Sequence, residues 1–487
     1  MKLVRTVLAS SSFALLAGCM VGPDFEKPAL ATSTHYDVEA ENALANGGAQ
    51  RIDFDRKVDA EWWSALGSAK LDDVMRRAIA GNLRLASADA TIAQANEAVT
   101  SVGGALGPQV DLGAQGSRQH AAGAAGFGTS NIYAIGPRVS FDLDIFGGTK
   151  RQVEEQAALA ELQRHRFDAA YLTVTGDVAT QALTLASARA QIDAVQGLLA
   201  NDRKNLALVQ AAHRYGSATL VDVATAETQL AQDETLLPPL AQQRDTAAHA
   251  LSVLAGKGPA DWVPPDFDLA DFSLPASLPL ALPSDLAHDR PDILQAESQL
   301  HAASAAIGVA TADLYPHLQL SGSLARVGPA PGLGTLWGLA AGLTAPIFHG
   351  GTLKANQRGA VDGYKAALAD YQQTVVASLG QVADVLQAIH HDGEELAAQD
   401  RALAAAAQGL ALNREGYKAG ETGVLQVVDA ERSYQHALLG QIRAKTAQYI
   451  DTVQLSVALG GRSDEAFERR AAYRNERPTS DGTVSAP

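Results

Sequence analysis

Histidines and carboxylates are the side chains of this chain best suited to chemistry, yet their spacing forms no catalytic motif. The sequence contains no HExxH, no GxSxG, no phosphate-binding loop and no pair of cysteines. The cluster His390-His391-Asp392 has residue types that bind metal ions, but helical neighbours i and i+1 point apart, so we interpret it as a solvated helix face. Four other histidines have no ligand partner at i+4: His213, His249, His301 and His436. We therefore expect neither an enzyme nor a bound metal or cofactor.

The single cysteine, Cys19, lies at the end of an N-terminal signal segment. Basic residues precede a short apolar run (7–16) that is too short to span a bilayer. The sequence L-A-G-C at 16–19 resembles a bacterial lipobox, and one exported cysteine cannot form an internal disulfide. We predict cleavage after residue 18 and lipidation of Cys19, with an incidental cysteine as the alternative. Met20 follows instead of Asp, so we expect an outer-membrane lipoprotein that extends into the periplasm.

The composition favours long, closely packed helices. Hydrophobic residues make up 47% of the 487 residues, largely as alanine, and aromatic residues only 5%. A net charge of −16 argues against a nucleic-acid partner. Past the signal there is no apolar run of the length of a transmembrane helix, so any membrane span would have to consist of β-strands.

The chain is two copies of one unit. Four segments recur in the same order at shifts of 202 to 208 residues. The paired segments begin at Asn82 and Arg290, Leu106 and Leu314, Asp144 and Pro346, and Arg214 and Lys418. We accordingly divide the chain into a signal peptide (1–18), an N-terminal segment with the first repeat and a linker (19–284), a second repeat (285–461) and a polar tail (462–487).

Each copy is expected to contain a helix, two strands and a long helical hairpin. The expected helices cover 68–103, 148–214 and 219–255 in the first copy, and 285–313, 351–418 and 422–459 in the second. Pro108 and Pro316 end the first helix of each copy, and glycine turns at Gly216 and Gly420 reverse the chain. A helix over 148–214 would be about 100 Å long, which is comparable with the depth of a periplasm.

Two stretches in each copy alternate with a period of two, as strands do. The clearest is 133–145, and in the second copy apolar residues alternate from 318 to 324 and from 337 to 345. Loops are expected between the paired strands at 121–130 and 326–334. We expect one parity to face a polar lumen and the other, with Phe141 and Leu320, to face lipid; the edge of a soluble sandwich is the alternative. The residues expected to face the lumen are Asp142, Asp144, Gln319 and Ser321.

Four strands cannot close a barrel, because small closed barrels need about eight. Open edges in lipid would leave backbone groups unsatisfied at several kcal/mol each, so strands in a membrane require an oligomer. Three copies would give twelve strands above a ring of helices. We therefore expect a mainly α protein with a membrane β part, built as a long helical periplasmic barrel with four strands per protomer in a trimeric twelve-stranded outer-membrane β-barrel.

The sequence resembles the TolC-like outer-membrane efflux proteins, and among them the lipidated NodT type that works with resistance-nodulation-division pumps. The motifs that carry the resemblance are GCMVGPDFEKP (18–28), WW (62–63), LRLASADA (83–90), DIFGG (144–148), RPDI followed by AE (290–297), PIFHGG (346–351) and ALGG (458–461). They are spread in order over nearly the whole mature chain. The resemblance implies a homotrimer with a twelve-stranded barrel on a helical tunnel, and an equatorial girdle to which the linker 256–283 contributes.

The resemblance also implies a gate at the inner ends of the helical hairpins. It implies that Asp429 carboxylates ring the aperture, and that Asp222 ties the tip closed with Tyr417 as its hydrogen-bonding partner. Gln426 stands where better-known members carry a second Asp, and Thr422 replaces an Arg that some members use. Three Asp429 carboxylates around one axis would repel each other and attract cations. Capping or solvation of a helix turn is the alternative role for Asp429.

The function that follows is a passive outer-membrane exit duct of a tripartite efflux pump. The partners that the resemblance implies are an inner-membrane proton-driven transporter, a periplasmic adaptor protein and outer-membrane lipid. Two alternatives remain at this point: the duct of a type I protein secretion system, and a structural lipoprotein without a pore. The sequence does not encode which substrates are exported.

Overall fold

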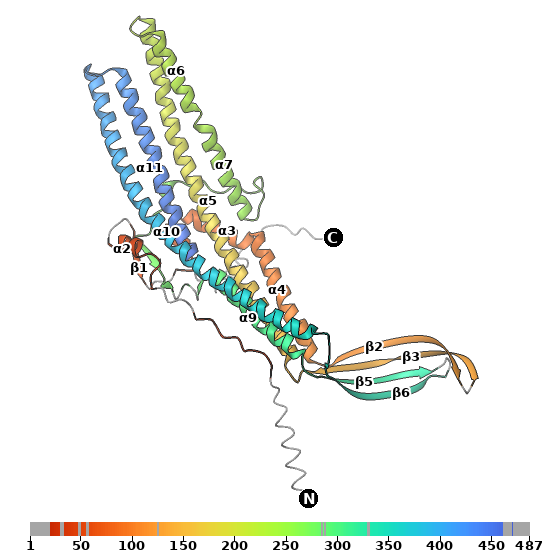
Figure 1. Cartoon of the computed structure of the whole chain (residues 1–487). Coiled ribbons are helices and arrows are strands. Elements are labelled where there is room, and N and C mark those ends of the chain that lie inside the picture. Colours follow the sequence, from red (N-terminus) through yellow and green to blue (C-terminus); the bar gives the residue numbers. More distant parts are fainter. Residues whose placement is uncertain are drawn as a thin grey trace. The chain divides into compact units, whose positions relative to one another are not determined.

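The computed structural model describes residues 20–29, 34–46, 50–54, 58–123, 126–283, 286, 289–328, 332–460 and 470. The predicted signal peptide, Cys19 and all of the predicted tail except Arg470 lie outside these residues. The chain forms two compact units (Figure 1). We call them the strand unit (1–29, 90–165 and 294–374) and the hairpin unit (30–89, 166–293 and 375–487). Each unit draws on both sequence repeats, so the units do not coincide with the repeats.

Two very long helices run through both units. They are α5 (Gly148–Arg214, 67 residues) and α10 (Thr352–Ala419, 68 residues), within one residue of the predicted bounds. Each is followed by a glycine in the left-handed region, Gly216 with φ +79° and Gly420 with φ +80°. A side chain is strained at such φ values, which explains why glycine occupies both turns. The returning helices are α6 (Leu220–Glu234) and α7 (Leu237–Leu254) in the first repeat and α11 (Val424–Ala458) in the second.

The first returning helix is broken, which corrects the single helix predicted over 219–255. The break falls at residues 235–236, and Pro238 and Pro239 lie in the first turn of α7. Proline lacks an N–H and clashes with the preceding turn, so it is tolerated there but not in a helix interior. No proline lies in α11, which is continuous.

The first helix of the first repeat is also broken, into α3 (Ala69–Gly81) and α4 (Leu83–Gly103). Asn82 lies between them, and its Oδ1 accepts hydrogen bonds from the backbone N–H groups of Arg84 (2.9 Å) and Leu85 (3.2 Å). This cap starts α4, so the helix predicted over 68–103 is two helices. Its counterpart is α9 (Pro291–Ala312). The shorter elements are α2 (Val38–Asn46), β1 (Arg51–Phe54), η1 (Trp62–Leu66), η2 (Gly104–Leu106), η3 (Leu269–Asp271) and β4 (Ser277–Leu280).

Tertiary contacts repeat with the sequence and confirm the duplication. In the first repeat the Nδ2 of Asn82 donates to the carbonyl of Leu254 at 2.9 Å. In the second, the Nη1 of Arg290 donates to the carbonyl of Ala458 at 2.8 Å. Arg290 follows Asn82 by 208 residues and Ala458 follows Leu254 by 204, which are the shifts of the sequence repeat. The same contact therefore joins the start of one helix to the end of the returning helix in both copies.

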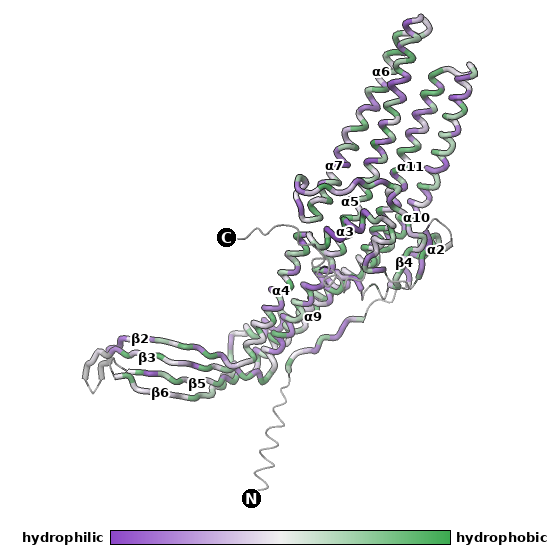
Figure 2. Tube along the Cα trace, turned by 180° about the vertical axis from the view of Figure 1, so that it is seen from behind, coloured by the Kyte–Doolittle hydropathy of each residue, from purple (hydrophilic) through white to green (hydrophobic). Residues whose placement is uncertain are grey.

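The four predicted strands form one antiparallel sheet in the order β2-β3-β5-β6. The strands are β2 (Gln109–Gly123), β3 (Gly126–Leu143), β5 (His317–Gly328) and β6 (Gly334–Thr344). Phe141 pairs with Leu320, and Asp142 pairs with Gln319. Residues directly opposite in an antiparallel pair point to the same face, so the register confirms the predicted parity of these residues. Hydrophobic and hydrophilic residues both occur along the strands (Figure 2).

Two predictions about the strands were wrong. The loop predicted over 121–130 is largely strand, because β2 continues to Gly123 and pairs it with Gly126. Asp144 lies after the end of β3 instead of on its polar face. Its carboxylate accepts hydrogen bonds from the backbone N–H groups of Thr149 (3.0 Å) and Lys150 (2.9 Å) and so caps the first turn of α5.

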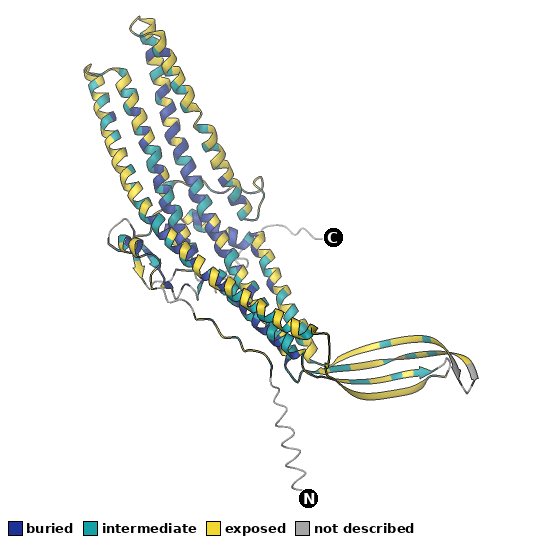
Figure 3. Cartoon of the chain, in the orientation of Figure 1, coloured by how far each residue is buried: buried dark blue, intermediate teal, exposed yellow. Residues whose placement is uncertain are grey.

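The core of the hairpin unit lies around α5, whose buried residues form a continuous stripe in Figure 3. Ala179, Ala182 and Ala186 are fully buried, and such small side chains let neighbouring helices approach closely. Polar contacts join α11 to the same stretch of α5: the Oγ1 of Thr446 donates to the Oγ of Ser187 at 2.9 Å. Within the described part of the chain, no helix combines the length and the apolar character that crossing a membrane requires.

Candidate functional site

The tip of the first hairpin uses Asp222 as a helix cap. The carboxylate accepts hydrogen bonds from the backbone N–H and the hydroxyl of Thr219, both at 2.8 Å. The Oγ1 of Thr219 in turn accepts from the backbone N–H of Asp222 at 3.2 Å, which completes a capping box at the start of α6. These hydrogen bonds lower the pKa of Asp222.

The tip of the second hairpin presents the other residues predicted for the gate. Tyr417 is 45% exposed, and among the described residues no hydrogen bond joins it to Asp222. The structure of the single chain therefore does not form the predicted pair. Gln426 is exposed in the first turn of α11, and Asp429 is exposed one turn later.

Asp429 lines a hollow between the helices of the hairpin unit. The hollow has a volume of about 720 Å³ and is bounded by α5, α10, α11 and the end of α6. Its lining includes a second carboxylate, Asp233, and two groups that carry or can acquire positive charge, Arg432 and His436. Asp429 thus lies in a hollow of mixed apolar and charged lining, and its exposure is also compatible with the alternative role of solvating a helix turn.

A buried carboxylate that the sequence did not single out lies two residues further along. Glu431 is only 6% exposed and is hydrogen-bonded to the side chain of Asn201 on α5. Its Oε1 also accepts from the Nη2 of Arg414 on α10 at 2.9 Å. Glu431 therefore connects three helices near the tips. The ion pair is only partly buried, because the Arg414 side chain is half exposed, so solvent weakens its contribution to stability.

Asp202 lies beside this group, and its carboxyl holds a proton more tightly than an ordinary aspartate does. Burial, followed by the hydrogen bond with Asp233 and the charges of Asp233 and Glu431, raises the pKa of Asp202 to about 7, although Arg432 acts in the opposite direction. No sequence pattern distinguishes Asp202 or Glu431 from the many exposed carboxylates of the long helices, because the sequence does not reveal which of them are buried. A polar residue on a long helix is ordinarily solvated.

The N-terminal segment 20–28, which we call the anchor segment, packs into the strand unit. The backbone N–H of Val21 donates to the carbonyl of Phe146 at 3.1 Å, just after β3 ends. Arg151, only 1% exposed, donates to the carbonyl of Val21 at 3.2 Å and pairs with Asp24 and Glu154, each at 2.7 Å. The chain is thus fixed next to the base of the sheet two residues after Cys19, which itself lies outside the described residues.

Glycines let the anchor segment approach its neighbours. Gly22 has φ +92°, and a Cβ there would lie 2.4 Å from the Cα of Gly308 on α9. Gly147 has φ +76°, and a Cβ there would lie 2.7 Å from the side chain of Met20. No side chain larger than hydrogen fits at Gly22, for both steric and conformational reasons. This accounts for Gly22 of the N-terminal motif and Gly147 of DIFGG.

The sequence was compared with families and proteins that are already characterised. The family model described as "Outer membrane efflux protein" matches residues 74–257 and 282–461, which is most of the chain. The chain belongs to the outer membrane efflux protein family. The two matched ranges correspond to the two repeats, so each repeat is one copy of the family's unit.

Relatives and solved structures agree with this family. The pyoverdine export outer membrane protein OpmQ of Pseudomonas putida is 30% identical over 422 residues, covering 83% of this chain and 88% of that protein. The cation efflux system protein CusC of Escherichia coli O6:H1 is 27% identical over 461 residues, covering 92% of this chain and 96% of that protein. The outer-membrane channel OprN superposes with a TM-score of 0.82 at 25% identity, covering 91% of this chain and 99% of that one. The MtrE outer membrane channel of Neisseria gonorrhoeae superposes with a TM-score of 0.79 at 25% sequence identity. The match covers 91% of this chain and 98% of that one.

The matches confirm the predicted family, fold class and general function. The outer membrane efflux protein described here is an outer-membrane exit duct of an efflux pump, and its relatives are channels and not enzymes. The resemblance rests on motifs that the structure explains. For example, Arg290 of RPDI is bonded to the carbonyl of Ala458 in ALGG, and Gly460 of that motif has φ +87° beside Arg290.

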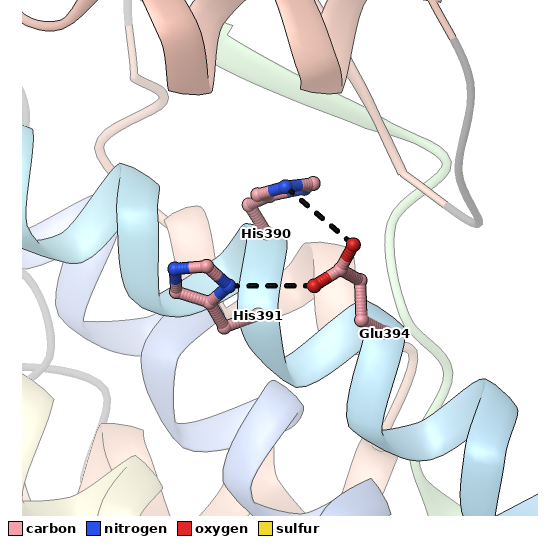
Figure 4. Close-up of side chains that lie close together, drawn as sticks. All are labelled: His390, His391 and Glu394. Atoms are coloured by element: carbon pink, nitrogen blue, oxygen red, sulfur yellow. Dashed lines mark hydrogen bonds and ion pairs between the residues drawn. The ribbon is translucent and has the colours of Figure 1, made fainter.

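The histidine cluster differs from the one considered in the sequence. Asp392 is not part of it: burial and a hydrogen bond with Asp451 raise the pKa of Asp392 to about 7. Instead, the carboxylate of Glu394 faces both His390 and His391, with one oxygen toward each ring (Figure 4). Neighbouring histidines point apart on a helix, but Glu394, one turn away, reaches both of them.

We expect Gly22→Ala to release the anchor segment. The left-handed φ strains any L residue by about 1–2 kcal/mol, and the added Cβ clashes with Gly308. Hydrogen–deuterium exchange at residues 20–28 should become roughly tenfold faster for each 1.4 kcal/mol lost. Gly359→Ala is the matched control, since a Cβ there meets nothing within 4 Å. Equal exchange in the two variants would contradict the account of Gly22.

We expect Asp202→Asn to stabilise the protein at alkaline pH only. The folded pKa of about 7 lies above the ordinary 3.8, so the folded state binds the proton more tightly. Stability from this group is therefore lost as pH rises from about 4 to 7, and above 7 a buried charge remains. Unfolding at pH 8 should occur roughly 2–4 °C higher in the variant, with little difference at pH 4. Asp193→Asn, an exposed change on the same helix, is the control; a pH-independent difference would refute the assignment.

Proposed function

We propose that three copies of this chain assemble into a lipid-anchored duct that carries small molecules from a periplasmic adaptor and an inner-membrane, proton-driven transporter to the cell exterior. Each copy would contribute four strands to a twelve-stranded barrel in the outer membrane. The duct itself would be passive, because the transporter supplies the energy. The observation that carries the proposal is the four-stranded sheet with two unpaired edges and one apolar face.

The sheet has no partner at either edge within the described residues. Its order places β2 and β6 at the edges, and every residue of β6 is exposed in the single chain. An exposed edge is a template for pairing with another chain, and in lipid its unsatisfied backbone groups cost several kcal/mol each. Pairing β6 of one copy with β2 of the next satisfies both edges and supports a closed assembly.

One face of the sheet is apolar across all four strands. The register aligns one row of this face as Val110, Val139, Gly322 and Leu339, and another as Leu143, Leu318 and Leu343. Leu339 is 82% exposed and Val110 is 67% exposed. An apolar surface of this extent is unusual on a monomeric soluble protein but suits contact with lipid tails. The opposite face includes Asp111 paired with Arg138 and suits an aqueous lumen.

The anchor segment supports lipidation of Cys19. The contacts of Val21 and Arg151 fix the chain at the base of the sheet, two residues after Cys19. Acyl chains on Cys19 would therefore enter the same membrane that the strands cross. Each buried methylene of an acyl chain contributes about 0.8 kcal/mol to membrane binding.

We place the periplasmic gate at the hairpin tips, around Asp222, Tyr417, Gln426 and Asp429. Asp429 lines the hollow between the helices, and three copies would bring three such carboxylates around one axis. Asp222 stabilises the start of α6 through its capping box, so its loss would loosen the tip of the first hairpin. Pairing of Tyr417 with Asp222 would then be a contact of the closed trimer and not of the single chain.

We expect Leu320→Arg to prevent insertion into the outer membrane. Arginine on the lipid-facing side of a membrane strand costs about 2–4 kcal/mol near the bilayer midplane. The variant should yield little trimer in outer-membrane fractions, measured by gel mobility without boiling. Gln319→Arg, one residue earlier on the opposite face, should assemble normally. If the two variants assemble equally, the assignment of the faces is wrong.

We expect the variant Asp222→Ala, Asp429→Ala to open the duct. In planar bilayers, the wild type should show small or rare channel openings and the variant larger ones. The reason is that the variant lacks both the helix cap of Asp222 and the negative charge of Asp429. The exposed pair Asp193→Ala, Asp384→Ala is the control. If the wild type and the variant have equally large conductance, the protein is a duct but these residues do not form its gate. If the wild-type trimer inserts and does not conduct, the proposal that it forms a pore is wrong.

A further inference from the structure

We propose that His390, His391 and Glu394 on α10 form a binding site for a divalent first-row transition-metal cation such as Zn²⁺. The Nε2 of His390 lies 3.9 Å from one carboxylate oxygen of Glu394, and the Nδ1 of His391 lies 3.4 Å from the other. The three ligand atoms all lie within 4.8 Å of one another. The proposal rests on these residues and is independent of the assembly and the gate.

The helix geometry explains why the three groups converge. Successive residues of an α-helix are about 100° apart around its axis, so the two histidines alone would diverge. Glu394 lies about 40° from His390 and about 60° from His391, one turn further along the helix. Its carboxylate therefore faces both rings, whose centroids are 5.2 Å apart (Figure 4).

The donor set selects the class of cation. Two imidazole nitrogens and a carboxylate suit Zn²⁺ or Cu²⁺, whereas Mg²⁺ and Ca²⁺ prefer oxygen ligands alone. Ligands at bond lengths of about 2.1 Å in a tetrahedron are about 3.4 Å apart, which matches the separation of His391 and Glu394. A small rotation of His390 would close the remaining gap. Three protein ligands leave a fourth position for water.

The site is accessible to an ion. The side chains of His391 and Glu394 are 68% and 67% exposed, and that of His390 is 27% exposed. Substitution of the two exposed residues therefore removes ligands without disturbing the core. Binding would join two successive turns of α10 through one ion.

The test is metal titration of the full-length protein, purified in detergent and stripped with a chelator. Calorimetry with Zn²⁺ should give one equivalent per chain that excess Mg²⁺ does not displace. His391→Ala and Glu394→Gln should each weaken binding by roughly tenfold or more. The control is His213→Ala, an exposed histidine near the end of α5. Titration with Co²⁺ distinguishes the donors, because nitrogen and oxygen ligands give weak visible bands and the thiolate of an unlipidated Cys19 gives intense near-ultraviolet absorption.

Loss of binding in His391→Ala and Glu394→Gln, with retention in His213→Ala, would establish the site. Undiminished binding in Glu394→Gln would overturn it, because the ion would then be held elsewhere. A dominant thiolate spectrum, or no saturable binding by the wild type, would overturn it as well. Circular dichroism and gel filtration of each variant exclude loss of folding as the cause.

Discussion

Every backbone N–H and C=O of a strand must be paired when water is absent, and this requirement governs the β part of the chain. Among the described residues, one side of β2 and one side of β6 have no strand partner. Its apolar face is continuous across the strands, so it cannot be turned toward water without cost. The assembly proposed above would resolve both problems together, because further copies would pair with the open edges and enclose one face of the sheet.

The two repeats show how one contact was kept while its surroundings changed. Asn82 and Arg290 occupy equivalent positions and bond to equivalent carbonyls, of Leu254 and Ala458. Arg290 has a longer side chain and also pairs with Asp292, at 2.7 Å. That ion pair holds the pKa of Asp292 below its usual range, although burial acts in the opposite direction. The second repeat thus has an ion pair where the first has a neutral amide.

The hairpin tips depend on polar contacts more than on a hydrophobic core. Large apolar residues near the turns are exposed, including Tyr215, Leu220 and Val221. The helices are joined there by the buried carboxylate of Glu431, and α6 begins with the capping box of Asp222. Regions with few buried apolar contacts open at lower free energy than the core does. This distribution is compatible with the gate proposed above, which would move the tips while the body of the helical hairpins stays intact.

The sequence by itself determined the duplication, the family, the long helices and the parity of the strands. These features depend on local patterns: a repeat is read by self-alignment, Gly216 and Gly420 mark turns, and alternation fixes which strand residues share a face. It also carries the signal for the break before α7, because Pro238 and Pro239 disfavour the continuous helix predicted over 219–255. Tertiary structure decided the rest. Asp144 and Asp222 became helix caps, while Glu431 and Asp202 became buried, since burial depends on which helices pack together.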